Sequence, residues 1–309
     1  MEVALVILTV LVGALLTAQA TANVQLNGAL GNPAAAAALQ LAIAGGLLVV
    51  VAAATGELPA LAEVGSVPAW ELLGGLGSAL YIGAGIVLFP RLGALTSMGL
   101  FVTGQLAGSV VLDGFGLLGL EQRTPSILVV LGALAVAYGI AAIVRTGRRA
   151  TAVTAPAARS RTWLYALGLA AGAGLPVQAA VNARLRSELD APFGAAAVSF
   201  GIALTAMVVV LAVALAAGAP RPRPAGLRRV PWWGWAGGLV GAGYVTTTLI
   251  AVVEIGAAPT IALTVAGQQI ASAVADHRGL LRLPRRPLTV TRLTGVTTLV
   301  AGAALIQLG

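Results

Sequence analysis

Two glutamine positions lie in the middle of long apolar stretches and match each other in sequence context. Gln105 stands in LTSMGLFVTGQLAGSVV, and Gln268, followed by Gln269, stands in PTIALTVAGQQIASAV. An amide side chain carries two hydrogen-bond donors and an acceptor oxygen with two lone pairs. A few such groups in an apolar cavity would hold a neutral or zwitterionic solute. The alternative is a hydrogen bond between helices, worth about 0.6 kcal/mol on average, that only fastens them together.

A second set of amides recurs earlier in each half of the chain. Gln19 and Asn23 are four residues apart, as are Gln178 and Asn182, so each pair lies on one face of a helix. Gln19 and Gln178 are expected to bond to another helix or to complete the lining of the solute site. Asn23 and Asn182 lie nearer a helix end, where either lipid headgroups or the solute would satisfy them.

These pairs belong to an internal repeat, which has to be recognised before the fold can be interpreted. Gln178 lies 159 residues after Gln19, and Gln268 lies 163 residues after Gln105. Asp113 and Asp276 also match at the second offset. The sequence therefore predicts one repeat over residues 1–145, a basic linker over residues 146–161, and a second repeat over residues 162–309.

The composition identifies the solvent as a lipid bilayer. Hydrophobic residues make up 59% of the 309 residues and charged residues only 9%, against about 25% charged in a soluble domain. Ten apolar runs are long enough to cross a bilayer as helices. They cover residues 3–21, 34–55, 70–89, 94–112, 124–144, 162–181, 194–217, 233–253, 258–275 and 288–308. The predicted fold class is an all-α integral membrane protein of ten transmembrane helices.

The arginines predict the orientation. Of the 18 basic residues, all but Arg123, Arg184 and Arg186 lie in or beside the loops that follow odd-numbered helices. The positive-inside rule places those loops, including the linker 146–161, in the cytoplasm and both termini outside. Because each repeat has five helices, an odd number, the two repeats must be inverted relative to each other.

Several function classes are excluded. The chain has no cysteine, which rules out thiolate chemistry and disulfides, and it has no Walker, HExxH or GxSxG motif. Its one histidine, His277, is expected to be a solvated loop residue. We therefore predict no enzyme activity, no catalytic residue, no cofactor and no metal. The arginines between apolar runs indicate membrane orientation rather than nucleic-acid binding.

The acidic residues leave few candidates for proton coupling. All ten lie at or near predicted helix ends, and none is at mid-span. Glu71 and Glu254 are the only plausible proton carriers. We expect both to be solvated helix ends rather than coupling residues.

Taken together, the motifs resemble the YdcZ-type family of the drug/metabolite transporter (DMT) superfamily. The similar features are the QxxxN pairs and the segments that run from Gly104-Gln105 to Leu120 and from Gly267-Gln268 to Leu283. The resemblance implies five-helix units that pair antiparallel, here fused in one chain that would work as a monomer, in a bacterial cytoplasmic (inner) membrane. It implies transport of a small solute, which inverted repeats carry out by alternating access. The alternatives are a channel and a non-transporting membrane assembly partner.

The inverted topology can be tested because the chain is naturally cysteine-free. A single cysteine at Ala60 should react with an impermeant thiol reagent from outside the cell. A cysteine at Ala225 should react only after permeabilisation. The reverse pattern would contradict the orientation, and labelling of both from one side would contradict the inversion.

Overall fold

The computed structural model describes residues 2–119, 122, 126–151, 162–244, 247 and 257–308, and these residues contain helices and loops but no strand. The all-helical fold class is confirmed. The α-helices are α1 (Glu2–Leu30), α2 (Pro33–Ala54), α3 (Gly75–Leu92), α4 (Ala94–Phe115), α5 (Ile127–Thr151), α6 (Thr162–Leu189), α7 (Pro192–Ala216), α9 (Ala257–Arg278) and α10 (Val290–Leu308). Short 3₁₀ segments connect them: η1 (Leu58–Ser66), η2 (Ala69–Gly74), η3 (Leu117–Gly119), η5 (Pro224–Arg229), η6 (Trp232–Trp235) and η7 (Leu280–Arg282).

Seven described helices are long and apolar enough to cross a membrane, and they correspond to the first seven predicted runs. The eighth run lies partly outside the described residues, and residues 237–244 of it are helical. α9 and α10 cover the last two runs, the apolar part of α10 being the shorter stretch Val290–Ile306. α1 and α6 extend further than predicted, because the polar residues after each apolar run continue the helix until Gly31 and Asp190, which both have positive φ.

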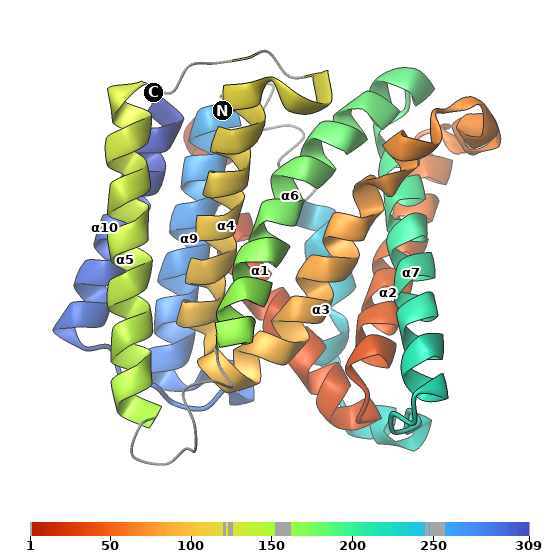
Figure 1. Ribbon diagram of the computed structural model, residues 1–309. Helices are drawn as coiled ribbons and strands as arrows, with labels where there is room; N and C mark the ends of the chain where they lie inside the picture. Colours follow the sequence, from red (N-terminus) through yellow and green to blue (C-terminus); the bar gives the residue numbers. More distant parts are fainter. Residues whose placement is uncertain are drawn as a thin grey trace.

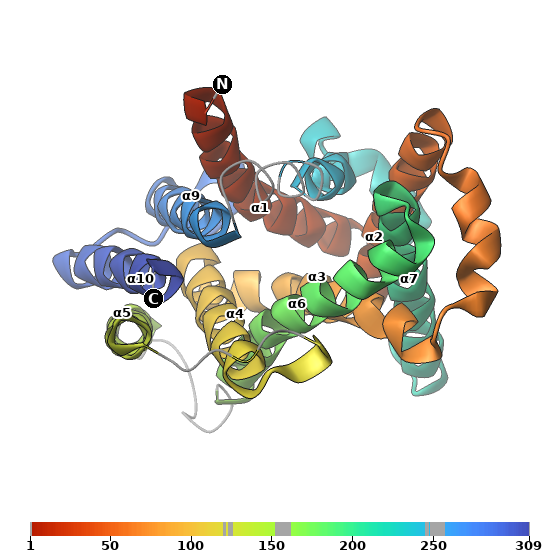
Figure 2. The same cartoon turned by 90° about the horizontal axis from the view of Figure 1, so that it is seen from above.

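Helices of the two halves alternate in the bundle, so that the main contacts join one half to the other. α1 of the first half contacts α9 of the second, and α6 of the second half contacts α4 of the first. Figure 2 shows these four helices between two outer pairs, α5 with α10 on one flank and α2 with α7 on the other. Each of these four contacts joins the two halves. Because α1 is equivalent to α6 and α9 to α4, the α1–α9 and α6–α4 contacts are repeat equivalents, and we call them the exchanged contacts.

Glycines set the distance at the two exchanged contacts. A Cβ built on Gly104 would meet the backbone of Leu169 and Ala173, and one built on Gly267 would meet the backbone of Val10 and Ala14. The partners match at the 159-residue offset, and the glycines match at the 163-residue offset. A side chain at either position would push the helices apart, because the two backbones are already in contact. The sequence repeat is therefore also a repeat of contacts.

Equivalent helices run in opposite directions. The first residues of α4 are hydrogen-bonded to Asp276 near the end of α9, and the start and end of α5 pack against the end and start of α10 through Gly132, Gly139, Gly295 and Gly302. Figure 1 shows both chain termini at one end of the bundle. We call that end the terminal end, and we call the other end, where the loops 217–230 and 279–289 lie, the basic end.

Candidate functional site

The first amide cluster consists of Gln19, Asn23 and Gln40, on α1 and α2. All three are buried, with exposed fractions of 6%, 2% and 0%. A Cβ on Gly241 would meet Gln19 Nε2 at 2.8 Å, so Gln19 reaches across to the second half. Both amide atoms of Gln40 and the Oδ1 of Asn23 are buried without a hydrogen-bond partner. Asn23 is therefore a buried group, and hydration by headgroups does not apply to it in this structure.

The second amide cluster consists of the equivalent residues Gln178, Asn182 and Ser199, on α6 and α7. Gln178 Oε1 accepts a hydrogen bond of 2.9 Å from Ser78 Oγ on α3. Asn182 Oδ1 and Ser199 Oγ are buried without a partner. The two clusters are thus related by the repeat, and in each a glutamine reaches the other half.

The central glutamines lie beside these clusters on the exchanged contacts. Gln268 is 4% exposed, and its backbone oxygen accepts a bond of 3.3 Å from Thr17 Oγ1 of α1. Gln105 is partly buried on α4, next to the Gly104 contact with α6. No hydrogen bond joins the side chains of Gln105 and Gln268 among the described residues. Gln269 is fully buried, and neither of its amide atoms has a partner.

A tyrosine pair that the sequence reasoning missed packs against the largest apolar cluster. Tyr244 follows Tyr81 by 163 residues, so the two are repeat equivalents. The hydroxyl of Tyr81 contacts Met98 Sδ at 3.7 Å. The Tyr81 ring lies 4.6 Å from that of Phe101. The 163-residue offset was the signal that could have identified them.

Glu71 differs from its expected surroundings. The expectation that it is a solvated helix end is wrong, because its exposed fraction is 3% and its Oε2 is buried without a partner. η2, which carries Glu71, folds back against α6 and α7 and so covers the side chain. Glu254, the second coupling candidate, lies outside the described residues.

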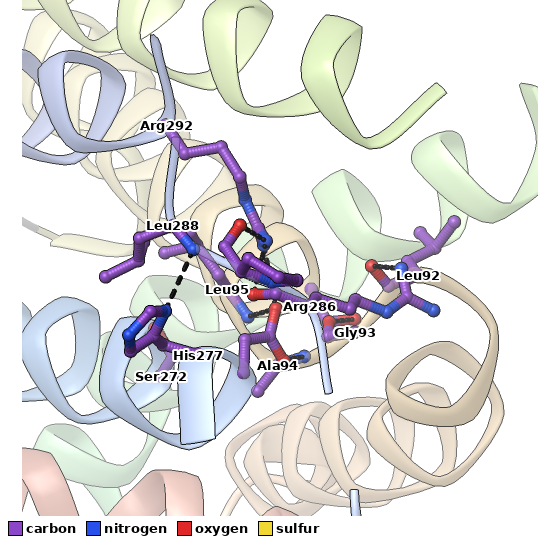
Figure 3. A network of polar contacts seen from close by, with 12 residues as sticks. Leu92, Gly93, Ala94, Leu95, Ser272, His277, Arg286, Leu288 and Arg292 are labelled. Carbon is purple, nitrogen blue, oxygen red and sulfur yellow. Dashed lines mark hydrogen bonds and ion pairs between the residues drawn. The ribbon is translucent and has the colours of Figure 1, made fainter. Parts of the chain in front are cut away.

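The strongest polar network lies at the basic end, around Asp276 (Figure 3). This carboxylate is fully buried, and its Oδ2 forms an ion pair of 2.8 Å with Arg292 Nη2. It also accepts hydrogen bonds from the backbone N–H groups of Ala94 (2.8 Å) and Leu95 (3.3 Å). These N–H groups open α4, where the helix dipole favours a negative charge. Gly93, with φ of 87°, makes the tight turn that presents them, and a Cβ there would meet Asp276 Oδ2 at 2.9 Å.

Further bonds hold the loop between α9 and α10 over this carboxylate. Arg286 donates from Nη1 to Leu92 O (2.6 Å) and from its backbone N–H to Asp276 O (2.6 Å). Arg292 Nη1 donates to Arg286 O at 3.0 Å. We call Asp276, Arg286, Arg292 and the start of α4 the latch. Removing one partner of such a buried pair costs roughly 3–5 kcal/mol, because the other charge stays buried and unpaired.

His277 lies in the last turn of α9, next to this loop. It is partly buried, and its Nδ1 accepts a hydrogen bond of 3.1 Å from the N–H of Leu288 (Figure 3). The expectation of a solvated loop histidine is therefore wrong. The described residues hold no group of three or more histidine, aspartate or glutamate side chains that could bind a metal ion.

The latch is not repeated in the first half. Asp113 matches Asp276, but Val129 stands where the second half has Arg292. Asp113 is partly buried, and within the described part of the chain it has no ion pair. The matched aspartates and the lone arginine inside the last apolar run were visible in the sequence. Their pairing was not, because it depends on how the end of α9 meets the start of α4.

Most of the chain matches the model of a known protein family. The family model described as "Putative inner membrane exporter, YdcZ" matches residues 4–142 and again residues 163–305. The chain belongs to this YdcZ family. The two matches confirm the two repeats, and together with the apolar helices they support a multi-pass membrane transporter rather than an enzyme. The family description places its members in the inner membrane.

Solved structures agree at the level of the fold. One, titled "Crystal structure of protein", has a TM-score of 0.54 and 17% sequence identity, and the alignment covers 97% of this chain and 94% of that chain. At this identity the likeness shows the fold alone. The search of curated proteins found no match.

Proposed function

We propose that this YdcZ-family protein is a secondary transporter of a small solute that works by alternating access between two inverted five-helix repeats. The observation that carries the proposal is the pair of exchanged contacts, α1 on α9 and α6 on α4. Through them each half packs against helices of the other half. Such halves can rock about a site at their interface. In this proposal the chain crosses the cytoplasmic membrane ten times and functions as a monomer. The basic end faces the cytoplasm and both termini lie outside.

Polar contacts at both ends favour a carrier over a channel. At the basic end the latch joins α9 and α10 to α4. At the terminal end Glu57 Oε2 accepts hydrogen bonds from the N–H groups of Phe193 (2.7 Å) and Gly194 (2.9 Å), which begin α7. A carrier needs closures that can break alternately at the two ends, and these contacts are of the kind that water can replace when they part.

The solute site in this proposal lies around the central glutamines and the two amide clusters. Its residues are Gln19, Asn23, Gln105, Gln178, Asn182, Gln268 and Gln269. Leaving a buried amide unpaired costs about 1–3 kcal/mol, so the orphan atoms of Asn23, Asn182 and Gln269 call for a partner at some stage of the cycle. A solute with both donors and acceptors would supply one without needing a fixed charge on the protein.

This site can be tested with Gln105→Leu and Gln268→Leu. The solute is first identified by comparing metabolites of cells with and without the protein, and its uptake is then measured in proteoliposomes. We expect each variant to weaken apparent affinity by roughly tenfold, the loss of about 1.4 kcal/mol, while thermal stability in detergent stays unchanged. Gln122→Leu, at an exposed glutamine, is the matched control. Unchanged affinity with lowered stability would show that the amides only fasten helices.

Burial now makes Glu71 the leading candidate for proton coupling within this proposal. Its side chain is 3% exposed, and its Oε2 is buried without a hydrogen-bond partner. We expect Glu71→Gln to abolish the acceleration of uptake by an imposed pH gradient while solute exchange continues. Glu63→Gln, on the exposed part of η1, should behave as the wild type. Gradient-driven uptake that survives in Glu71→Gln would remove Glu71 from the mechanism.

A further inference from the structure

A hollow of about 450 Å³ lies at the basic end, separate from the amide clusters. The last turns of α1, the η5 segment and Arg282 of η7 surround it. Its polar lining consists of Arg223, Arg229, Arg282 and Gln25. Small residues of α1 and η5, together with Val230 and Pro231, form the rest. Three arginines and one amide thus converge on one concave surface.

Backbone contacts hold the walls of this hollow in place. The N–H of Arg223 donates to Leu30 O (2.9 Å), and Asn32 Nδ2 donates to Pro220 O (2.8 Å). A Cβ on Gly226 would meet the carbonyl oxygen of Ala29, so η5 lies directly against the α1 backbone. The hollow is therefore part of the folded structure and not a gap beside a loose loop.

The positive charge in the hollow is not balanced by protein carboxylates. Within the described part of the chain, Arg223, Arg229 and Arg282 form no ion pair, and the one ion pair found there joins Arg292 to Asp276. All three side chains are exposed to solvent at the mouth of the hollow. Guanidinium groups bind phosphate and carboxylate oxygens through paired N–H donors.

Arg282 is held in a backbone conformation that arginine rarely adopts. Its φ is 62°, in the left-handed region, directly after Leu281 with φ of 54°. The first repeat has the glycine Gly119 at the equivalent position. Non-glycine residues in this region carry strain, which is typically kept where a side chain is needed. In the second repeat, the strained residue at this position is an arginine whose side chain lines the hollow.

Among the described residues, the positions at the terminal end that match this hollow differ from it. The residue equivalent to Gln25 is Arg184, which donates to Leu118 O (3.0 Å) and lies over the ring of Trp70 (5.8 Å). Glu63 and Glu188 stand where the hollow has Gly226 and Ala29. The matching positions at the terminal end therefore carry acidic residues where the hollow has small ones.

We propose that this hollow binds a phosphate oxyanion. The phosphate is either free in solution or the headgroup of an anionic phospholipid, since both present the same oxygens to the arginines. The site is independent of the solute site and of transport, so it is tested by binding alone.

The test measures thermal unfolding of the full chain in a neutral maltoside detergent. Inorganic phosphate is titrated at constant ionic strength, and phosphatidylglycerol is titrated in parallel against phosphatidylcholine. A ligand that binds only the folded state raises the melting temperature with its concentration. We expect Arg282→Gly to weaken binding of the stabilising anion at least tenfold. Its melting temperature without anion should be equal to or above that of the wild type, because glycine suits the φ of this position.

Arg223→Gln should weaken anion binding in the same way, and Arg228→Gln is the matched control. Arg228 lies on the same segment and its loss changes the net charge equally, but it does not line the hollow. Stabilisation by phosphate with this variant pattern supports the site and assigns a soluble anion. Stabilisation by phosphatidylglycerol alone, with the same pattern, supports the site and assigns a lipid. No stabilisation by either, or an equal loss in Arg228→Gln, overturns the proposal.

Discussion

Close backbone contact between the halves is the constraint on which the rest of the structure depends. Gly104 and Gly267 bring α4 onto α6 and α9 onto α1, and Gly172 and Gly13 do the same from the facing helices against Phe101 and Thr264. In a bilayer, apolar side chains gain little by leaving lipid, so helix association relies on such close packing and on polar bonds between helices. Because the contacts cross between halves, neither half buries its glycine faces alone. Gln268, beside Gly267, is buried at one of these contacts, and Gln105, beside Gly104, is partly buried at the other.

The packing contacts between helices have equivalents in both repeats, but the charged groups do not. The central clusters and the glycine contacts have equivalents in both halves, whereas within the described residues the latch around Asp276 and the arginine-lined hollow are found at the basic end. A symmetric bundle would have the same free energy with either end closed. In the proposed cycle the latch closes the basic end, and Glu57 with the start of α7 closes the terminal end. Asp113, which lacks a matching cation, would close the terminal end less firmly.

The sequence was sufficient for the all-helical membrane fold, because composition and apolar run length depend on no tertiary contact. The repeat was also readable, since matched residues such as Gln105 and Gln268 keep fixed offsets. The sequence could not reveal which helices touch. The burial of Glu71, the pairing of Asp276 with Arg292 and the hydrogen bond of His277 all depend on how distant helix ends meet. The expectation of a solvated helix end failed at Glu71 because η2 packs against α6 and α7. The expectation of a solvated loop residue failed at His277 because it lies in α9 and is bonded by the N–H of Leu288.

The central claim is that access at the basic end depends on the latch. The most direct measurement is the distance distribution between spin labels at Arg91→Cys and Arg278→Cys, by double electron–electron resonance on the chain in lipid nanodiscs. Both side chains are exposed on the two sides of the latch, and no native cysteine interferes. The account predicts one short distance in the otherwise wild-type chain and an added longer distance in Asp276→Asn, while Asp113→Asn leaves this distribution unchanged. An identical distribution in Asp276→Asn, with and without solute, would contradict the account.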